Sequence, residues 1–137
     1  MKKYILLVTS VFVILIVITT IFFSKIKFNQ IPVEDIAGKE FVLTNKFKAA
    51  DITIAFDAGR YYGFSGVNRY TGSYEQNKKG NIKLSQAATT MMSGNEELME
   101  IEKEYINELA EVEEIILEKD IILMKTKNGQ LKYEVKG

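Results

Sequence analysis

The 137-residue chain contains no cysteine, no histidine and no tryptophan, and it has only one proline. Without cysteine, no disulfide framework can form in any compartment. Without histidine, the chain cannot build Cys/His zinc sites, Ser-His-Asp triads or Cys-His dyads, and histidine cannot ligate heme. These absences remove the commonest metal centres and nucleophilic sites, so we expect no metal and no cofactor.

An excess of charge of one sign is also missing. Eighteen Lys and Arg balance eighteen Asp and Glu. Setting aside Lys2 and Lys3 leaves sixteen basic residues (18 minus 2) against eighteen acidic ones, so the rest of the chain is mildly acidic. Proteins that bind nucleic acids usually carry a basic face. We therefore expect no nucleic-acid partner.

One long apolar run lies at the N-terminus. Tyr4 to Phe23 are twenty residues without a charge, and a helix of that length spans roughly 30 Å, about the hydrocarbon thickness of a bilayer. A cleavable signal peptide has a shorter apolar core and small residues at its cleavage site, whereas this run ends in Ile-Phe-Phe-Ser-Lys. The segment therefore favours a signal-anchor transmembrane helix over residues 1–24 rather than a cleaved signal, with residues 4–23 in the membrane.

The charges that flank this segment bear on its orientation. Lys2, Lys3 and the free amino terminus favour a cytoplasmic N-terminus, while Lys25 and Lys27 favour the opposite. The short leading tail supports the first arrangement. We expect a single-pass membrane protein with a cytoplasmic N-terminus and an extracytoplasmic C-terminal domain.

Beyond the anchor, residues 25–35 are predicted to form a linker and residues 36–137 one domain. Turn residues separate short apolar segments typical of strands, at residues 40–44, 52–56, 60–64, 72–75, 81–84, 113–118, 121–124 and 131–135. Asn128-Gly129 is a strong signal for a two-residue hairpin turn.

One amphipathic helix is predicted between the fifth and sixth of these strands. Ser93 and Glu96 have the spacing of a capping box, and the apolar face carries Leu98, Ile101, Tyr105 and Leu109. A sheet and a helix can each bury the other's apolar face. We therefore predict an α+β fold, a curled, barrel-like antiparallel sheet of about eight strands packed on one helix.

The stretch from Gly63 to Tyr74 has the sequence G-F-S-G-V-N-R-Y-T-G-S-Y. It resembles the core signature of the META domain family, which includes the heat-shock protein HslJ, approximately G-x-x-G-C-N-x-Y-x-G-x-Y. Residues 36–43, 54–60 and 88–92 resemble other blocks of that family in the same order, and a glutamate-rich helix follows as it does there. The similarity extends over roughly residues 36 to 135.

The resemblance implies a small α+β, barrel-like domain at the bacterial cell envelope, associated with stress but without an established biochemical activity. Family members often carry cysteines where this chain has Val67 and Ser93, so a thiol role is excluded here. Phe41 stands where the family has tryptophan. Many members are lipoproteins, whereas this chain has a helical anchor in place of the lipid.

The same stretch supplies the candidate ligand or partner site, which comprises Gly63, Gly66, Asn68, Arg69, Tyr70, Gly72 and Tyr74. In a functional interpretation, the glycines let a ligand approach the backbone and the polar side chains contact it. In a structural interpretation, which we favour, the glycines allow bends or bulges, Asn68 satisfies buried backbone groups and Tyr74 packs in the core. A phosphate loop is excluded because no Lys-Ser/Thr follows Gly66.

Acidic residues concentrate between Glu96 and Asp120, a segment with eleven acidic residues and only two lysines. Because no D-x-D-x-D-G calcium loop is present, we interpret them as a solvated surface able to contact a basic partner. Met91 and Met92 are expected to fill the core beneath the helix.

These observations favour a membrane-anchored, non-catalytic binding or envelope-stress maintenance module. The first alternative is an accessory subunit of an envelope protein complex. A small carboxylate-based hydrolase ranks behind both, and we predict no catalytic residue.

Overall fold

The structure, a computed structural model, describes residues 30–137. The predicted signal anchor and the first part of the predicted linker lie outside the described residues. Within residues 30–137, no helix has both the length and the apolar character needed to span a membrane.

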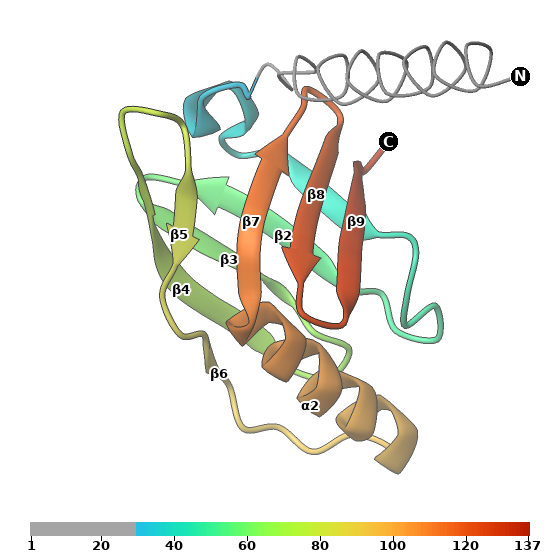
Figure 1. The fold of residues 1–137 in the computed structure, drawn as a ribbon. Helices are drawn as coiled ribbons and strands as arrows, with labels where there is room; N and C mark the ends of the chain where they lie inside the picture. The colour runs from blue at the N-terminus through green and yellow to red at the C-terminus, as the bar shows by residue number, and fades with distance from the viewer. Residues whose placement is uncertain (1–29) are drawn as a thin grey trace, which may run out of the picture.

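One antiparallel sheet forms the body of the described chain. Its strands are β1 (Glu40–Leu43), β2 (Thr53–Asp57), β3 (Arg60–Phe64), β4 (Arg69–Gln76), β5 (Ile82–Leu84), β6 (Ala88–Thr89), β7 (Val112–Leu117), β8 (Ile121–Thr126) and β9 (Gly129–Val135). The order is β5-β4-β3-β2-β1-β9-β8-β7, and β6 pairs with β4. Because β5 and β7 lie side by side, the sheet curls into a nearly closed barrel (Figure 1). The predicted barrel-like sheet is confirmed, and β6 is an additional short strand.

Two tight hairpins set the strand register. Ala58 and Gly59, between β2 and β3, both have positive φ values, 46° and 78°, the left-handed conformation that matches the twist of paired strands. The predicted hairpin between β8 and β9 is also confirmed. Thr126 pairs with Gly129, so the loop residues are Lys127 and Asn128, one position earlier than expected.

Alternation along β2 separates the barrel interior from its outer face. Ile52, Ile54 and Phe56 point inward and are fully buried, and each contributes about 1.5–3 kcal/mol by leaving water. Thr53 and Ala55 occupy the outer face between them. Of the two, Thr53 lines a cavity on that face.

The helix α2 (Glu96–Ala110) lies across one end of the barrel (Figure 1). Its N-cap is Asn95, whose side-chain oxygen accepts a hydrogen bond from Leu98 N at 2.8 Å. The capping box predicted from Ser93 is therefore wrong, because the closer asparagine satisfies the free backbone amide. The predicted apolar face is confirmed, since Tyr105 and Leu109 are buried against the barrel.

The prediction that Met91 and Met92 fill the core is wrong. Their side chains are 98% and 66% exposed. The physical reason is that the Asn68 amide bonds both Met92 N and Met92 O, at 2.7 and 3.1 Å. These bonds hold the main chain against the barrel, and the methionine side chains remain in solvent.

The other end of the barrel is covered by the 3-10 helix η1 (Val33–Ile36). Val33 and Ile36 are fully buried in the core. Gln30 donates a side-chain hydrogen bond to Gly80 O, and Val33 N donates to Gln76 Oε1. The beginning of the described chain is thus fixed to the hairpin between β4 and β5.

A chain of three tyrosine hydroxyls crosses the barrel interior. Tyr70 donates to Thr53 O at 2.6 Å, and the hydroxyl–hydroxyl distances are 2.7 Å from Tyr70 to Tyr105 and 2.9 Å from Tyr105 to Tyr133. Because a hydroxyl has one proton and a carbonyl has none, the donors must run from Tyr133 to Tyr105 to Tyr70 to Thr53 O. Burial raises the pKa of all three hydroxyls well above the usual value of 10, which keeps them protonated.

This direction predicts unequal costs for removing the two terminal hydroxyls. Tyr70→Phe leaves the Thr53 carbonyl and the Tyr105 proton without partners, so it is expected to lower the free energy of unfolding by about 1–3 kcal/mol. Tyr133→Phe removes only a donor and should cost less than about 1 kcal/mol. Urea unfolding of both variants measures the difference. An equal or larger cost for Tyr133→Phe would contradict the assigned direction.

Candidate functional site

The candidate stretch folds into the end of β3, a turn and β4, and the side chain of Asn68 lies at the centre of the turn. Its Oδ1 accepts from Thr90 Oγ1 and Met92 N, at 2.8 and 2.7 Å. Its Nδ2 donates to Met92 O and to Glu102 Oε1, at 3.1 and 2.7 Å. All four bonding positions of the amide are filled, and Asn68 is only 4% exposed. The geometry supports the structural interpretation of this residue.

Glu102 on α2 completes this arrangement from the helix side. Its Oε2 accepts from Ser65 Oγ at 2.6 Å and from Asn68 N at 2.7 Å. Partial burial disfavours the charged carboxylate, but the hydrogen bonds from Ser65 and Asn68 outweigh it and lower the pKa of Glu102 below its usual value of 4.5. We call Ser65, Asn68 and Glu102 the asparagine clasp, because they join the β3–β4 turn, the 90–92 segment and α2.

Two glycines of the stretch make room for other atoms. A Cβ on Gly63 would lie 2.0 Å from Thr53 O, and one on Gly72 would lie 2.4 Å from the Tyr61 ring. Gly66 has a φ of 106° and lies in the turn. Tyr74 packs edge-on against Phe56, with ring centroids 5.4 Å apart. Gly66, Asn68, Gly72 and Tyr74 therefore act within the fold.

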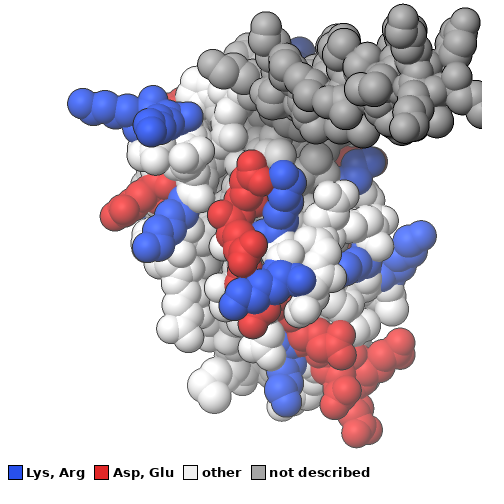
Figure 2. Space-filling view, in the orientation of Figure 1, with Lys and Arg blue, Asp and Glu red and all other residues white. Residues whose placement is uncertain are grey.

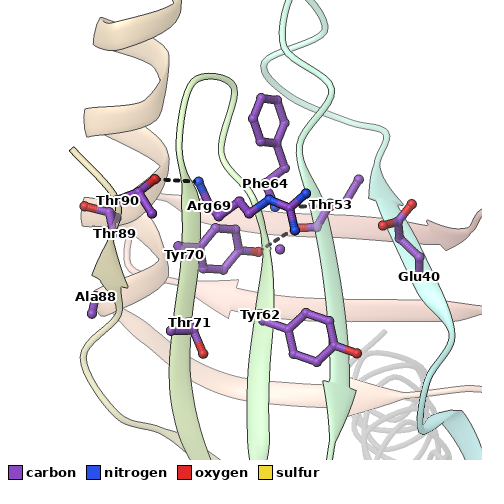
Figure 3. A pocket seen from close by; sticks show the side chains of 11 residues that line it. Glu40, Thr53, Tyr62, Phe64, Arg69, Tyr70, Thr71, Ala88, Thr89 and Thr90 are labelled. Atoms are coloured by element: carbon purple, nitrogen blue, oxygen red, sulfur yellow. Dashed lines mark hydrogen bonds between the residues drawn. The ribbon is translucent and has the colours of Figure 1, made fainter. Parts of the chain in front are cut away.

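The other three candidates line a groove on the outer face of the sheet. The cavity has a volume of about 550 Å³ and reaches from β6 across β4 and β3 toward β1 (Figure 3). The residues around it are Glu40, Thr53, Tyr62, Gly63, Phe64, Arg69, Tyr70, Thr71, Ala88, Thr89 and Thr90. A volume of this size is typical of small-ligand sites.

Eight of the eleven groove residues were not among the sequence candidates, and Tyr62, Phe64 and Thr71 are three of these. Tyr62 and Phe64 alternate with the buried Tyr61 and with Gly63 along β3, so they share its outer face. The period-2 pattern of this strand could have identified them. Tyr62 is 42% exposed, unusual for so large an apolar ring.

A second polar cluster lies where α2 meets β8. Glu108 is 8% exposed, forms an ion pair with Lys46 at 2.6 Å and accepts from Thr126 Oγ1 at 3.2 Å. Glu102 is half-buried, and the remaining α2 glutamates, Glu96, Glu97, Glu100 and Glu104, are exposed. Figure 2 shows acidic side chains gathered at the lower end of the molecule, where α2 begins. Among residues 30–137, no group of three or more acidic side chains has the arrangement of a metal site.

Comparison with known proteins gives a family and a fold. The sequence pattern of the META domain family matches residues 30–136, most of the chain. The chain therefore belongs to the META domain family, as the Gly63–Tyr74 signature predicts. No curated protein matches the chain.

Two solved structures share the fold. An NMR structure of a protein from Burkholderia xenovorans is similar over 76% of this chain and 86% of its own, with 22% identity and a TM-score of 0.62. A second NMR structure of a protein is similar over 77% of this chain and 95% of its own, with 23% identity and a TM-score of 0.57. Identities this low establish the shared architecture alone.

Proposed function

We propose that this protein is a non-catalytic binding module of the bacterial cell envelope, with the outer groove as its binding surface. The observation that carries the proposal is the groove itself, which combines a ligand-sized cavity, exposed aromatic surface and the Arg69 guanidinium. Within residues 30–137, Arg69 forms no ion pair and its side chain makes no hydrogen bond. A charged group left free at a cavity is a group available to a ligand.

The side chains around the groove support binding rather than catalysis. Its only carboxylate, Glu40, is paired with Lys136 at 2.6 Å. Two other hydrogen-bonded carboxylates lie outside the groove. Glu102 belongs to the asparagine clasp, and Glu108 forms an ion pair with Lys46. General acid–base chemistry needs an ionisable side chain placed at the reacting atoms, and the one carboxylate among the described groove residues is already paired.

The proposed location at the cell envelope rests on the N-terminal segment and on the family. Residues 4–23 are proposed to anchor the chain with its N-terminus in the cytoplasm, and the domain is proposed to lie outside. The association with envelope stress comes from the family resemblance. Gln30, bonded to Gly80, would then present the end of the barrel that carries η1 toward the membrane.

A second candidate function is that of an accessory subunit of an envelope complex. It is favoured by the exposed methionines at positions 91, 92 and 99, which lie beside the acidic start of α2. Methionine side chains adapt to varied apolar partners, and the carboxylates would add attraction for a basic surface.

The absence of native cysteine permits a direct test by single-cysteine labelling. Thr89→Cys places one exposed thiol at the groove, and Lys83→Cys places one on β5, outside the groove. Both should react with a membrane-impermeant maleimide in spheroplasts, whereas Lys3→Cys should react only after lysis. In native membranes a bound ligand should slow labelling at Thr89→Cys relative to the purified protein, with no such change at Lys83→Cys.

Two outcomes would count against the proposal. Labelling of Thr89→Cys only after lysis would reverse the proposed topology. Equal labelling rates in membranes and after purification, at both positions, would argue against a ligand in the groove.

A further inference from the structure

The groove places one cation between two aromatic side chains. Arg69 on β4 pairs directly with Phe64 on β3, and Tyr62 lies two residues along β3 on the same outer face. Figure 3 shows the Arg69 side chain extending across β3, with its guanidinium between the rings of Phe64 and Tyr62. The cation thus extends over the groove.

The groove crosses the sheet where the regular pairing of β2 and β3 ends. Their last regular pair is Ala55 with Tyr62. Beyond it, Phe64 N donates to the side chain of Thr53 at 3.2 Å, and Thr53 O accepts from the Tyr70 hydroxyl. The regular pairing therefore ends where Gly63 has no side chain, and Thr53 and Gly63 both line the cavity at that point.

Charge pairing leaves the groove with an uncompensated positive group. Glu40 is neutralised by Lys136, and the neighbouring Arg60 donates to Thr71 Oγ1 at 2.9 Å. No described carboxylate pairs with Arg69. A guanidinium presents two parallel N–H donors that match the two oxygens of a carboxylate.

Building on the proposed binding function, we propose that the groove takes a ligand that carries a carboxylate within a few bonds of a ring. The carboxylate binds Arg69 through paired hydrogen bonds, and the face of the ring lies against Tyr62 and Phe64. Aromatic side chains can pack against flat aromatic rings, and they can bury the apolar C–H face of a sugar ring. Two sources share this chemistry, the C-terminus of a peptide that ends in an aromatic residue and a uronic-acid sugar.

The test is an NMR titration of the full-length protein in detergent micelles with four probes. N-acetylphenylalanine and its primary amide represent the peptide source, while glucuronate and glucose represent the sugar source. We expect one of the two acids to cause saturable shifts at Tyr62, Phe64 and Thr71, and its neutral counterpart to cause none. The acid that saturates identifies the source.

Substitutions connect the binding to the guanidinium. Arg69→Gln should weaken binding of that acid roughly tenfold to a hundredfold, as expected for loss of charge-assisted hydrogen bonds. Arg69→Lys keeps the positive charge but lacks the two parallel N–H donors of the guanidinium, so it should cause an intermediate loss of affinity. Lys83→Gln, an exposed cation on β5 outside the groove, should leave binding unchanged.

Three results would overturn the inference: equal binding of an acid and its neutral counterpart, full binding by Arg69→Gln, or no shift at the groove with either acid. Binding of a neutral probe in the groove would reject the carboxylate while leaving the proposed binding function in place. The cysteine-labelling experiment tests that function separately, because it uses whatever ligand the native membrane supplies.

Discussion

Gly63→Ala is expected to lower the free energy of unfolding by about 3–5 kcal/mol, because it combines overpacking with the loss of a buried hydrogen bond. The new methyl group would lie 2.0 Å from Thr53 O and 2.8 Å from the Tyr70 hydroxyl. The first neighbour is backbone in the centre of the sheet, so β2 and β3 must move apart. That movement would also break the bond from Tyr70 to Thr53 O. Urea unfolding, followed by near-ultraviolet circular dichroism of the tyrosines, measures the loss.

Gly94→Ala provides a matched control for this substitution. Its new methyl group would lie 2.8 Å from Val67 Cγ2, the end of a side chain that can move. We expect a cost of roughly 1 kcal/mol there. The double variant Gly63→Ala/Tyr70→Phe separates the two contacts at Gly63, because it removes the hydroxyl and leaves the backbone clash. Recovery of stability in that double variant, or equal costs for Gly63→Ala and Gly94→Ala, would contradict the backbone explanation.

The parts of the fold that were predicted correctly depend on local chemistry. Alternation places Ile52, Ile54 and Phe56 on the inner face whatever strands lie beside them. Likewise, a glycine next to a turn favours a hairpin before any long-range contact forms. Local patterns of this kind act within a few residues, so a single sequence contains them.

The asparagine clasp depends on contacts that no local pattern contains. Asn68 bonds Met92 and Glu102, which lie 24 and 34 residues further along the chain. Only the folded barrel brings them together, and so the exposure of Met91 and Met92 was not foreseen. Glu102 was also concealed among ten other acidic residues between Glu96 and Asp120. Its position four residues after Leu98 and three before Tyr105, on the inward side of the helix, is the signal that could have distinguished it.

The groove shows a similar division between local and long-range information. Gly63, Arg69 and Tyr70 were predicted as site residues because they share one motif. However, the motif mixes inward and outward positions, since successive residues of a strand face opposite sides. The groove in the structure extends along the outer face across several strands. It therefore includes Tyr62 and Thr71, whereas Asn68 and Gly72 stabilise the fold.

Asn68→Ala is expected to lower the free energy of unfolding by about 2–4 kcal/mol, because it removes all four hydrogen bonds of a buried side-chain amide. The groups that lose a bond are Thr90 Oγ1, the backbone N–H and carbonyl of Met92, and Glu102 Oε1. Asn107→Ala is the control, since Asn107 is exposed on α2, and its change should stay within about 0.5 kcal/mol. Unchanged unfolding of Asn68→Ala together with lost ligand protection at the groove would instead make Asn68 a binding residue.

The effect of Asn68→Ala should also depend on pH. The pKa of Glu102 in the folded protein lies below its usual value of 4.5, so its carboxylate stabilises the fold above pH 4.5 and loses this contribution as the pH falls. Removing Asn68 takes away a donor to that carboxylate and brings the folded pKa closer to the unfolded one. The stability difference between wild type and Asn68→Ala should therefore be larger at pH 7 than at pH 3, as measured by urea unfolding at both values. A difference that grows toward acid would mean that the clasp does not stabilise the ionised form of Glu102.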